Sequence, residues 1–141
     1  MRQFKIPQHT LTHNLLAIGY GGGLMIWLST ESTHIGLTVL LGLGLALMIV
    51  GLGVLHWLGG RNLNLMRGWS VLFGIITGAL TPITTFFLML FKNVQHSHIV
   101  PDFSNEVLWE ILTRTPAWAL AGGLIGAALL LIGFAIPKPA N

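Results

Sequence analysis

The histidines of this chain are its best candidates for chemistry, and one group of them lies around residue 96. His96 and His98 are separated by one residue, and Asp102 follows four residues after His98. Residues two apart in an extended segment point the same way, so both imidazoles can reach one ion. With His34 as a third nitrogen ligand, these residues suit zinc or copper. We predict a divalent metal site here; a plain solvated loop is the alternative interpretation.

A second candidate pair is His56 with His13. His56 lies between Leu55 and Trp57 near the end of a long apolar segment. An imidazole in that position can ligate the metal of a haem or of a chlorophyll-type pigment, and His13 is the expected mate at a similar depth. The alternative is that the dipole at a helix C-terminus favours a histidine there without any cofactor.

Missing residue types exclude several classes of enzyme and transporter. The chain has no cysteine, which removes thiolate metal sites and cysteine nucleophiles. It also lacks the Gly-x-Ser-x-Gly pattern of hydrolases. No acidic or basic residue lies in the central part of any apolar segment, which argues against proton-coupled antiporters and rotary-ring subunits. We therefore expect a protein that is not an enzyme and that buries no charge.

The composition predicts a membrane protein. Of 141 residues, 53% are hydrophobic and only 8% are charged, whereas soluble domains have roughly 25% charged residues. Seven basic and four acidic side chains cannot cover a water-exposed surface, so we expect the lipid bilayer to cover much of it. The net charge of +3 comes without any basic run, and we expect no nucleic acid partner.

Four apolar segments approach the ~20 residues that a spanning helix needs. The first could be mistaken for a secretory signal, but residues 28–31 offer no small-x-small cleavage site, so we expect a retained span. The prediction is an all-α integral membrane protein, a single four-helix transmembrane bundle over residues 1–141. Its spans are residues 11–28, 35–58, 66–91 and 117–136.

The longest connection, residues 92–115, contains a predicted amphipathic helix over residues 104–114. Ser104 is its expected N-cap. Apolar and charged residues then fall on opposite sides, which is typical of a helix that lies on the membrane surface or on a partner. The apolar side consists of Val107, Leu108, Ile111 and Leu112, and the charged side of Glu106, Glu110 and Arg114.

The charges also predict the orientation. Four crossings put five of the seven basic residues on the side of both termini, and put all four acids on the other side. Positively charged segments stay cytoplasmic, so both termini should face the cytoplasm, most simply in a bacterial inner or thylakoid-type membrane. The five basic residues are Arg2, Lys5, Arg61, Arg67 and Lys138.

Small residues recur four apart in every predicted span. Such stripes let membrane helices approach closely. They predict packing inside one four-helix unit, with a homo-oligomer contact or a groove for pigment, lipid or quinone as alternatives. The pairs are Gly19/Gly23, Gly42/Ala46, Gly74/Gly78 and Gly122/Gly126.

Three functional hypotheses remain open. The first is a non-catalytic accessory or assembly subunit of a larger respiratory or photosynthetic membrane complex, whose partners are other membrane subunits. The second is a metal-, haem- or pigment-binding membrane protein that uses the histidines named above. The third is a small channel or transporter for a neutral or lipid-like solute, with Pro82 as a hinge.

Overall fold

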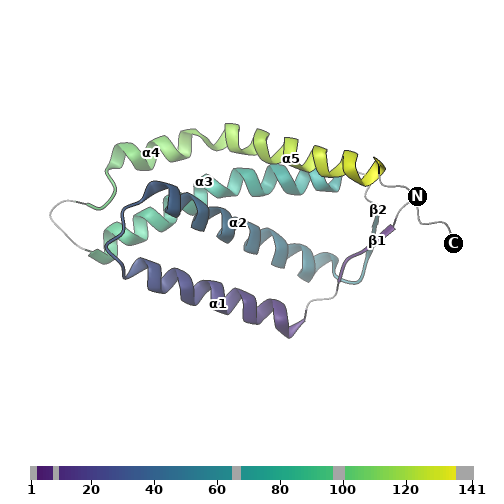
Figure 1. Ribbon diagram of the computed structural model, residues 1–141, viewed down its shortest axis with the longest axis horizontal. Helices are drawn as coiled ribbons and strands as arrows, with labels where there is room; N and C mark the ends of the chain where they lie inside the picture. The colour runs from purple at the N-terminus through teal and green to yellow at the C-terminus, as the bar shows by residue number, and fades with distance from the viewer. Residues whose placement is uncertain (1–2, 8–9, 65–67, 97–100, 136–141) are drawn as a thin grey trace.

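A computed structural model describes residues 3–7, 10–64, 68–96 and 101–135 of the chain. The described part is helical, apart from one short two-stranded ribbon (Figure 1). The helices are α1 (Leu11–Leu28), α2 (Ile35–Leu58), α3 (Trp69–His96), α4 (Asn105–Thr113) and α5 (Thr115–Ala135), and the strands are β1 (Gln3–Lys5) and β2 (Asn62–Asn64).

Three of the described helices are long and apolar enough to cross a membrane, namely α2, α3 and residues 115–133 of α5. Helix α1 has the bounds predicted for the first span but is not among the three. Its first turn carries Thr12, His13 and Asn14, and a glycine triplet follows at Gly21–Gly23. These residues lower its hydropathy, so the prediction of four spans is met by three helices on length and composition.

Helices α3 and α5 pack backbone against backbone through glycine. A Cβ on Gly74 would meet the carbonyl group of Gly122, and a Cβ on Gly122 would meet that of Gly74. Gly78 and Gly126 are equally tight, against the backbones of Trp118 and Ser70. These two predicted stripes therefore serve contacts within the chain.

Helix α2 packs on α3 through a small residue and a run of threonines. A Cβ on Gly42 would lie 2.9 Å from the backbone nitrogen of Thr85, so only glycine fits. The Thr84 hydroxyl donates to the Gly42 carbonyl oxygen at 2.7 Å, and Ala46 is fully buried one turn further along α2. Helix α3 continues through Pro82, which is also buried here.

Helix α1 packs mainly through its C-terminal half. Leu24, Trp27 and Leu28 form a buried cluster with Leu88 of α3. The hydroxyl of Tyr20 donates to the Leu41 carbonyl on α2. In contrast, the apolar residues of the first turns of α1 are exposed: Leu11, Leu15, Leu16 and Ile18.

The ribbon joins the segment before α1 to the segment after α2. Strands β1 and β2 pair antiparallel, with Gln3 opposite Asn64. The pairing extends past the strands, because Ile6 donates its N–H to Arg61 O and accepts from the N–H of Gly60. The ribbon and the C-terminal end of α5 lie at the same end of the bundle (Figure 1).

Helix α4 has the predicted two-sided character. The Ser104 hydroxyl accepts from the Val107 N–H at its start. Leu108 and Ile111 are buried with Met89 of α3 and with Phe103, while the charged side is exposed. The apolar side therefore contacts this chain's own α3, and α4 runs on almost directly into α5 (Figure 1).

Candidate functional site

The structure brings together two of the predicted metal ligands. His96 Nδ1 lies 2.5 Å from Asp102 Oδ2, and each side chain is 14% exposed. His34 is exposed at the N-cap of α2. His98 lies outside the described residues. In the described part of the chain, no three histidine, cysteine or acidic side chains gather as a metal site requires, so the four-ligand site stays a prediction.

His13 caps the start of α1. Its Nδ1 accepts the N–H of Thr10 at 3.2 Å and lies 2.7 Å from the Thr10 hydroxyl. A neutral imidazole that binds a metal through Nε2 carries its proton on Nδ1, and it then cannot accept the Thr10 N–H. Cofactor ligation and capping by His13 therefore compete. His56 is exposed in the last turn of α2, and the haem or pigment pair remains a prediction.

A lysine is buried at the end of the bundle away from the ribbon. The Lys92 side chain is 0% exposed. Its Nζ donates to Ser32 O at 2.6 Å and lies 4.2 Å from the centroid of the Trp27 ring. The expectation that the chain buries no charge is therefore wrong. The sequence predicts Lys92 in the connection after the third span, whereas α3 continues past it to His96.

The surroundings of Lys92 are only partly satisfied. Trp27 Nε1 and Ser32 Oγ are buried and have no hydrogen-bond partner among the described residues. Asp102 is close enough to attract the ammonium group, but it pairs with His96. A buried ammonium that donates to a carbonyl and lies over an indole ring holds both groups in place. Lys92 thus ties α3 to α1 and to the connection between α1 and α2.

The connection between α3 and α4 is closed by an amide clamp. Asn93 donates its side-chain N–H to Phe103 O at 2.8 Å, and its Oδ1 accepts the Phe103 N–H at 2.9 Å. The His96–Asp102 pair lies inside this clamp in sequence. The hydrogen bonds between Asn93 and Phe103 therefore hold the segments that carry His96 and Asp102 close to each other.

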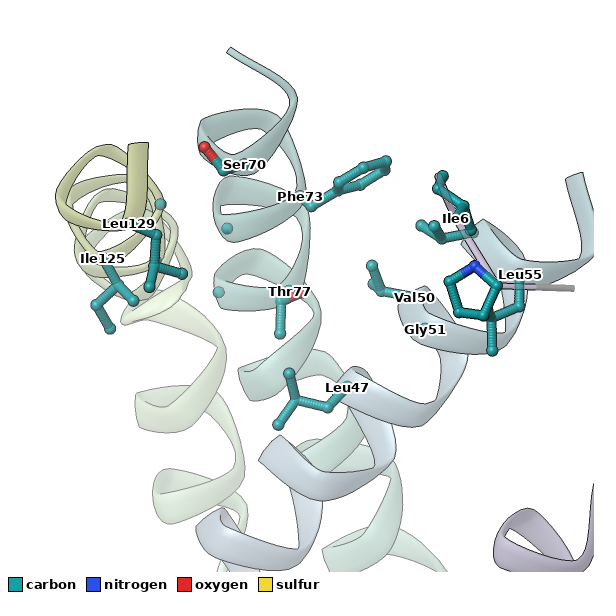
Figure 2. Close-up of a pocket in the computed structure, with 16 residues that line it drawn as sticks. Ile6, Leu47, Val50, Gly51, Leu55, Ser70, Phe73, Thr77, Ile125 and Leu129 are labelled. Atoms are coloured by element: carbon teal, nitrogen blue, oxygen red, sulfur yellow. The ribbon is translucent and has the colours of Figure 1, made fainter. Parts of the chain in front are cut away.

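An apolar groove lies at the ribbon end of the bundle (Figure 2). It has a volume of about 590 Å³, and Ile6 and Pro7 lie at its end. Its walls are Leu47, Val50, Gly51, Val54 and Leu55 of α2, Ser70, Phe73, Gly74, Thr77 and Gly78 of α3, and Gly122, Ile125, Gly126 and Leu129 of α5. A Cβ on Gly51 would meet no atom within 4 Å, so part of the α2 wall is bare backbone beside empty space. Ser70 Oγ is buried in the wall, without a hydrogen-bond partner in the described chain.

A second cleft of about 440 Å³ separates the first half of α1 from α2. Its walls are Thr12, Leu15, Leu16, Gly19 and Tyr20 on α1 and Met48 on α2. Gly19 and Gly23, the small-residue pair predicted for this helix, have no atom of the described chain within 4 Å of an added Cβ. This stripe is thus left unpacked, unlike those of α3 and α5.

No family model matches the chain, and neither a curated protein nor a solved structure matches it.

The sequence analysis did not predict the burial of Lys92 or the position of the groove. One signal for the burial of Lys92 was present in the sequence. Lys92 and Asn93 follow directly on an apolar segment, and no glycine or proline ends the helix before them. For the groove, the small-residue stripes predict a groove for pigment, lipid or quinone only as an alternative interpretation.

Proposed function

We propose that this protein is a non-catalytic accessory or assembly subunit of a larger membrane complex, and that α1 is the helix that contacts the partner. In this proposal four helices cross the membrane, with α1 as the least apolar of them, and both termini face the cytoplasm. The three long apolar helices support the membrane location. The positions of the basic residues support the orientation.

The unpacked stripe on α1 is the observation that carries the proposal. In lipid, helices associate through close packing at small residues, because hydrocarbon offers no hydrophobic driving force between them. The glycines of α3 and α5 are already used in this way inside the chain. Gly19 and Gly23 offer the same bare backbone with nothing against it. A helix of another subunit fits this face better than lipid tails do.

The test compares two glycines that both face open space. The chain is expressed at its native level and extracted in mild detergent, and the mass of the extracted particle is measured. We expect the wild-type protein to migrate well above its own 15.3 kDa, and Gly19→Leu to release it from the larger particle. Gly53→Leu on α2 is the matched control, since Gly53 also has no neighbour within 4 Å. It should leave the particle intact, because Gly53 does not belong to the proposed contact face on α1. A wild-type protein that migrates alone would contradict the proposal.

The orientation is tested separately with a tag on each tail. We expect both tags to be inaccessible to a protease or a label added outside intact cells. Labelling of either tail from outside would contradict the assignment of both termini to the cytoplasm. A loss of the larger particle in the first experiment would leave this result unaffected.

A second proposal, metal binding, is favoured by the contact between His96 and Asp102. Histidines that ligate metals commonly donate their other ring N–H to a carboxylate. Asp102 would then orient His96 through Nδ1, and Nε2 would face the metal. This changes the role of Asp102 from a ligand to a residue that positions one.

Metal analysis of the purified protein after equilibration with zinc or copper tests this site. We expect about one bound ion, its loss in His96→Ala, and weaker binding in Asp102→Asn by about 10- to 100-fold, the usual effect of removing such a partner. His34→Ala distinguishes a site that includes His34 from one that does not. A metal-free protein with intact helical content would refute this second proposal.

A further inference from the structure

We propose that the groove between α2, α3 and α5 binds one acyl chain of an anionic glycerophospholipid, whose head group lies at the ribbon end beside Arg61. This inference goes beyond the role as a subunit. It rests on the membrane location proposed above but not on any partner protein. Three features of the groove carry it: its length and lining, a buried hydroxyl, and the charge around its mouth.

The groove has the length of one leaflet. Its walls on α2 and α3 extend from residue 47 to 55 and from residue 70 to 78, and each wall is about 12 Å long at a rise of 1.5 Å per residue. The hydrocarbon core of a bilayer is about 30 Å thick, so the groove covers most of one half of it. Figure 2 shows Leu47 at the deep end, and Ile6 and Ser70 toward the ribbon end. An acyl chain that enters from the ribbon end fits this direction.

The lining suits a hydrocarbon chain with one polar group near its head. The walls are almost wholly apolar, and the bare backbone at Gly51 leaves the groove open. The buried hydroxyl of Ser70 has no partner in the described chain, and an unmade hydrogen bond of this kind costs free energy. Ser70 is the second residue of α3 and lies at the depth where the ester carbonyls of a lipid would come. A rotation of the Ser70 side chain toward the groove would let its hydroxyl donate to an ester oxygen.

The charge at the mouth selects an anionic head group. Ile6, which lines the groove, donates its N–H to Arg61 O at 3.1 Å, and the Arg61 side chain is exposed. All four acidic residues belong to the opposite end of the bundle, in the α1–α2 connection and around α4. A phosphate at the ribbon end would thus lie near the basic residue Arg61 and far from all four acidic side chains. Basic residues beside the membrane attract anionic lipids in this way.

Two glycines of α2 make the test specific. Gly51 lines the groove and Gly53 does not, yet both have open space around an added Cβ. Gly51→Leu therefore places a side chain in the groove with no clash at its Cβ, and Gly53→Leu is its control. The purified chain in detergent is titrated with phosphatidylglycerol and with phosphatidylcholine of identical acyl chains, and bound lipid is counted by native mass spectrometry.

We expect the wild-type protein and Gly53→Leu to retain one phosphatidylglycerol and to bind phosphatidylcholine more weakly. Gly51→Leu should lose the lipid while its helical content and elution volume stay unchanged. Arg61→Gln should weaken phosphatidylglycerol binding about fivefold, the effect of one basic residue near an anionic surface. Equal binding by Gly51→Leu and Gly53→Leu, no preference for the anionic lipid, or a quinone or neutral lipid as the retained species would each overturn the inference. The chain is assayed alone, so the absence of a partner subunit does not affect the result.

Discussion

The contact between α3 and α5 predicts a large effect from a single methyl group. In Gly122→Ala, the added Cβ would lie 2.9 Å from the carbonyl carbon of Gly74 and 3.2 Å from the Cα of Gly78. Carbon atoms pack best at about 3.5–4.0 Å, and the Gly74 carbonyl oxygen is closer still to the added Cβ, so the helices must move apart by about 1 Å. Overpacking of this kind costs about 1–3 kcal/mol.

The control for this variant is Gly53→Ala. Alanine favours a helix over glycine by about 0.5–1 kcal/mol, and this gain applies at both positions. Gly53 has nothing within 4 Å of an added Cβ, so its variant should show the gain alone. We therefore expect the free energies of unfolding of the two variants to differ by about 1–3 kcal/mol, with Gly122→Ala the less stable.

The measurement is reversible unfolding in detergent micelles, followed by far-ultraviolet circular dichroism and tryptophan fluorescence. Trp118 lies on α5 beside Gly78 and reports directly on this interface. Because Gly74 and Gly122 face each other, the double variant should cost less than the sum of the single ones. Equal stability of Gly122→Ala and Gly53→Ala would refute the assignment of these glycines to a close backbone contact.

Three further substitutions have clear expected outcomes. Thr84→Val removes the hydrogen bond to the α2 carbonyl and should lower the free energy of unfolding by about 0.5–1.5 kcal/mol in the same assay. Lys92→Glu places an unpaired carboxylate against a carbonyl oxygen and the face of an indole ring, so we expect a loss of about 3–5 kcal/mol, whereas Gln95→Glu, exposed on the same helix, should be nearly neutral. Asn93→Ala should speed hydrogen exchange at the Phe103 amide much more than at the amides of α5, and unchanged exchange at Phe103 would argue against the clamp.

Local signals in the sequence predict much of the helical structure. The bounds of α1 and α2 match the predicted segments, because polar and glycine residues follow directly at Ser29 and Gly59. The N-cap at Ser104 and the two-sided pattern of α4 are also confirmed. These features depend on residues within a few positions of one another, so a single sequence contains the information.

The length of α3 could not be predicted in the same way. The apolar run predicts that the span ends at Phe91, but the helix continues to His96. Because the helix continues, Lys92 can donate a hydrogen bond to Ser32 O and lie over the Trp27 ring. Those partners lie some sixty residues earlier in the chain, and no local pattern connects them. The strands β1 and β2 are also not predicted from the sequence, since each has only three residues and its partner is distant in the chain.

The groove could not be predicted from the sequence either, as a comparison of Gly51 with Gly74 shows. Gly51 and Gly74 both lie in apolar helices with other small residues nearby. Gly74 faces the α5 backbone, while Gly51 faces open space. The difference comes from how α2 and α5 are placed on α3. The sequence predicts close packing at glycine, but only the arrangement of the helices separates a filled contact from an empty groove.

Helix α1 is held in place just before its first residue and again at its last turns. The pairing of β1 with β2 holds the chain just before it, and Leu24, Trp27 and Leu28 hold its last turns. A helix that is held at both ends responds to a side chain inserted beside it by bending in its middle. The backbone bends most easily at Gly21–Gly23, where no side chain stiffens it. In the proposed complex, bending at these three residues would widen the cleft beside Met48 and make room for side chains of the partner helix.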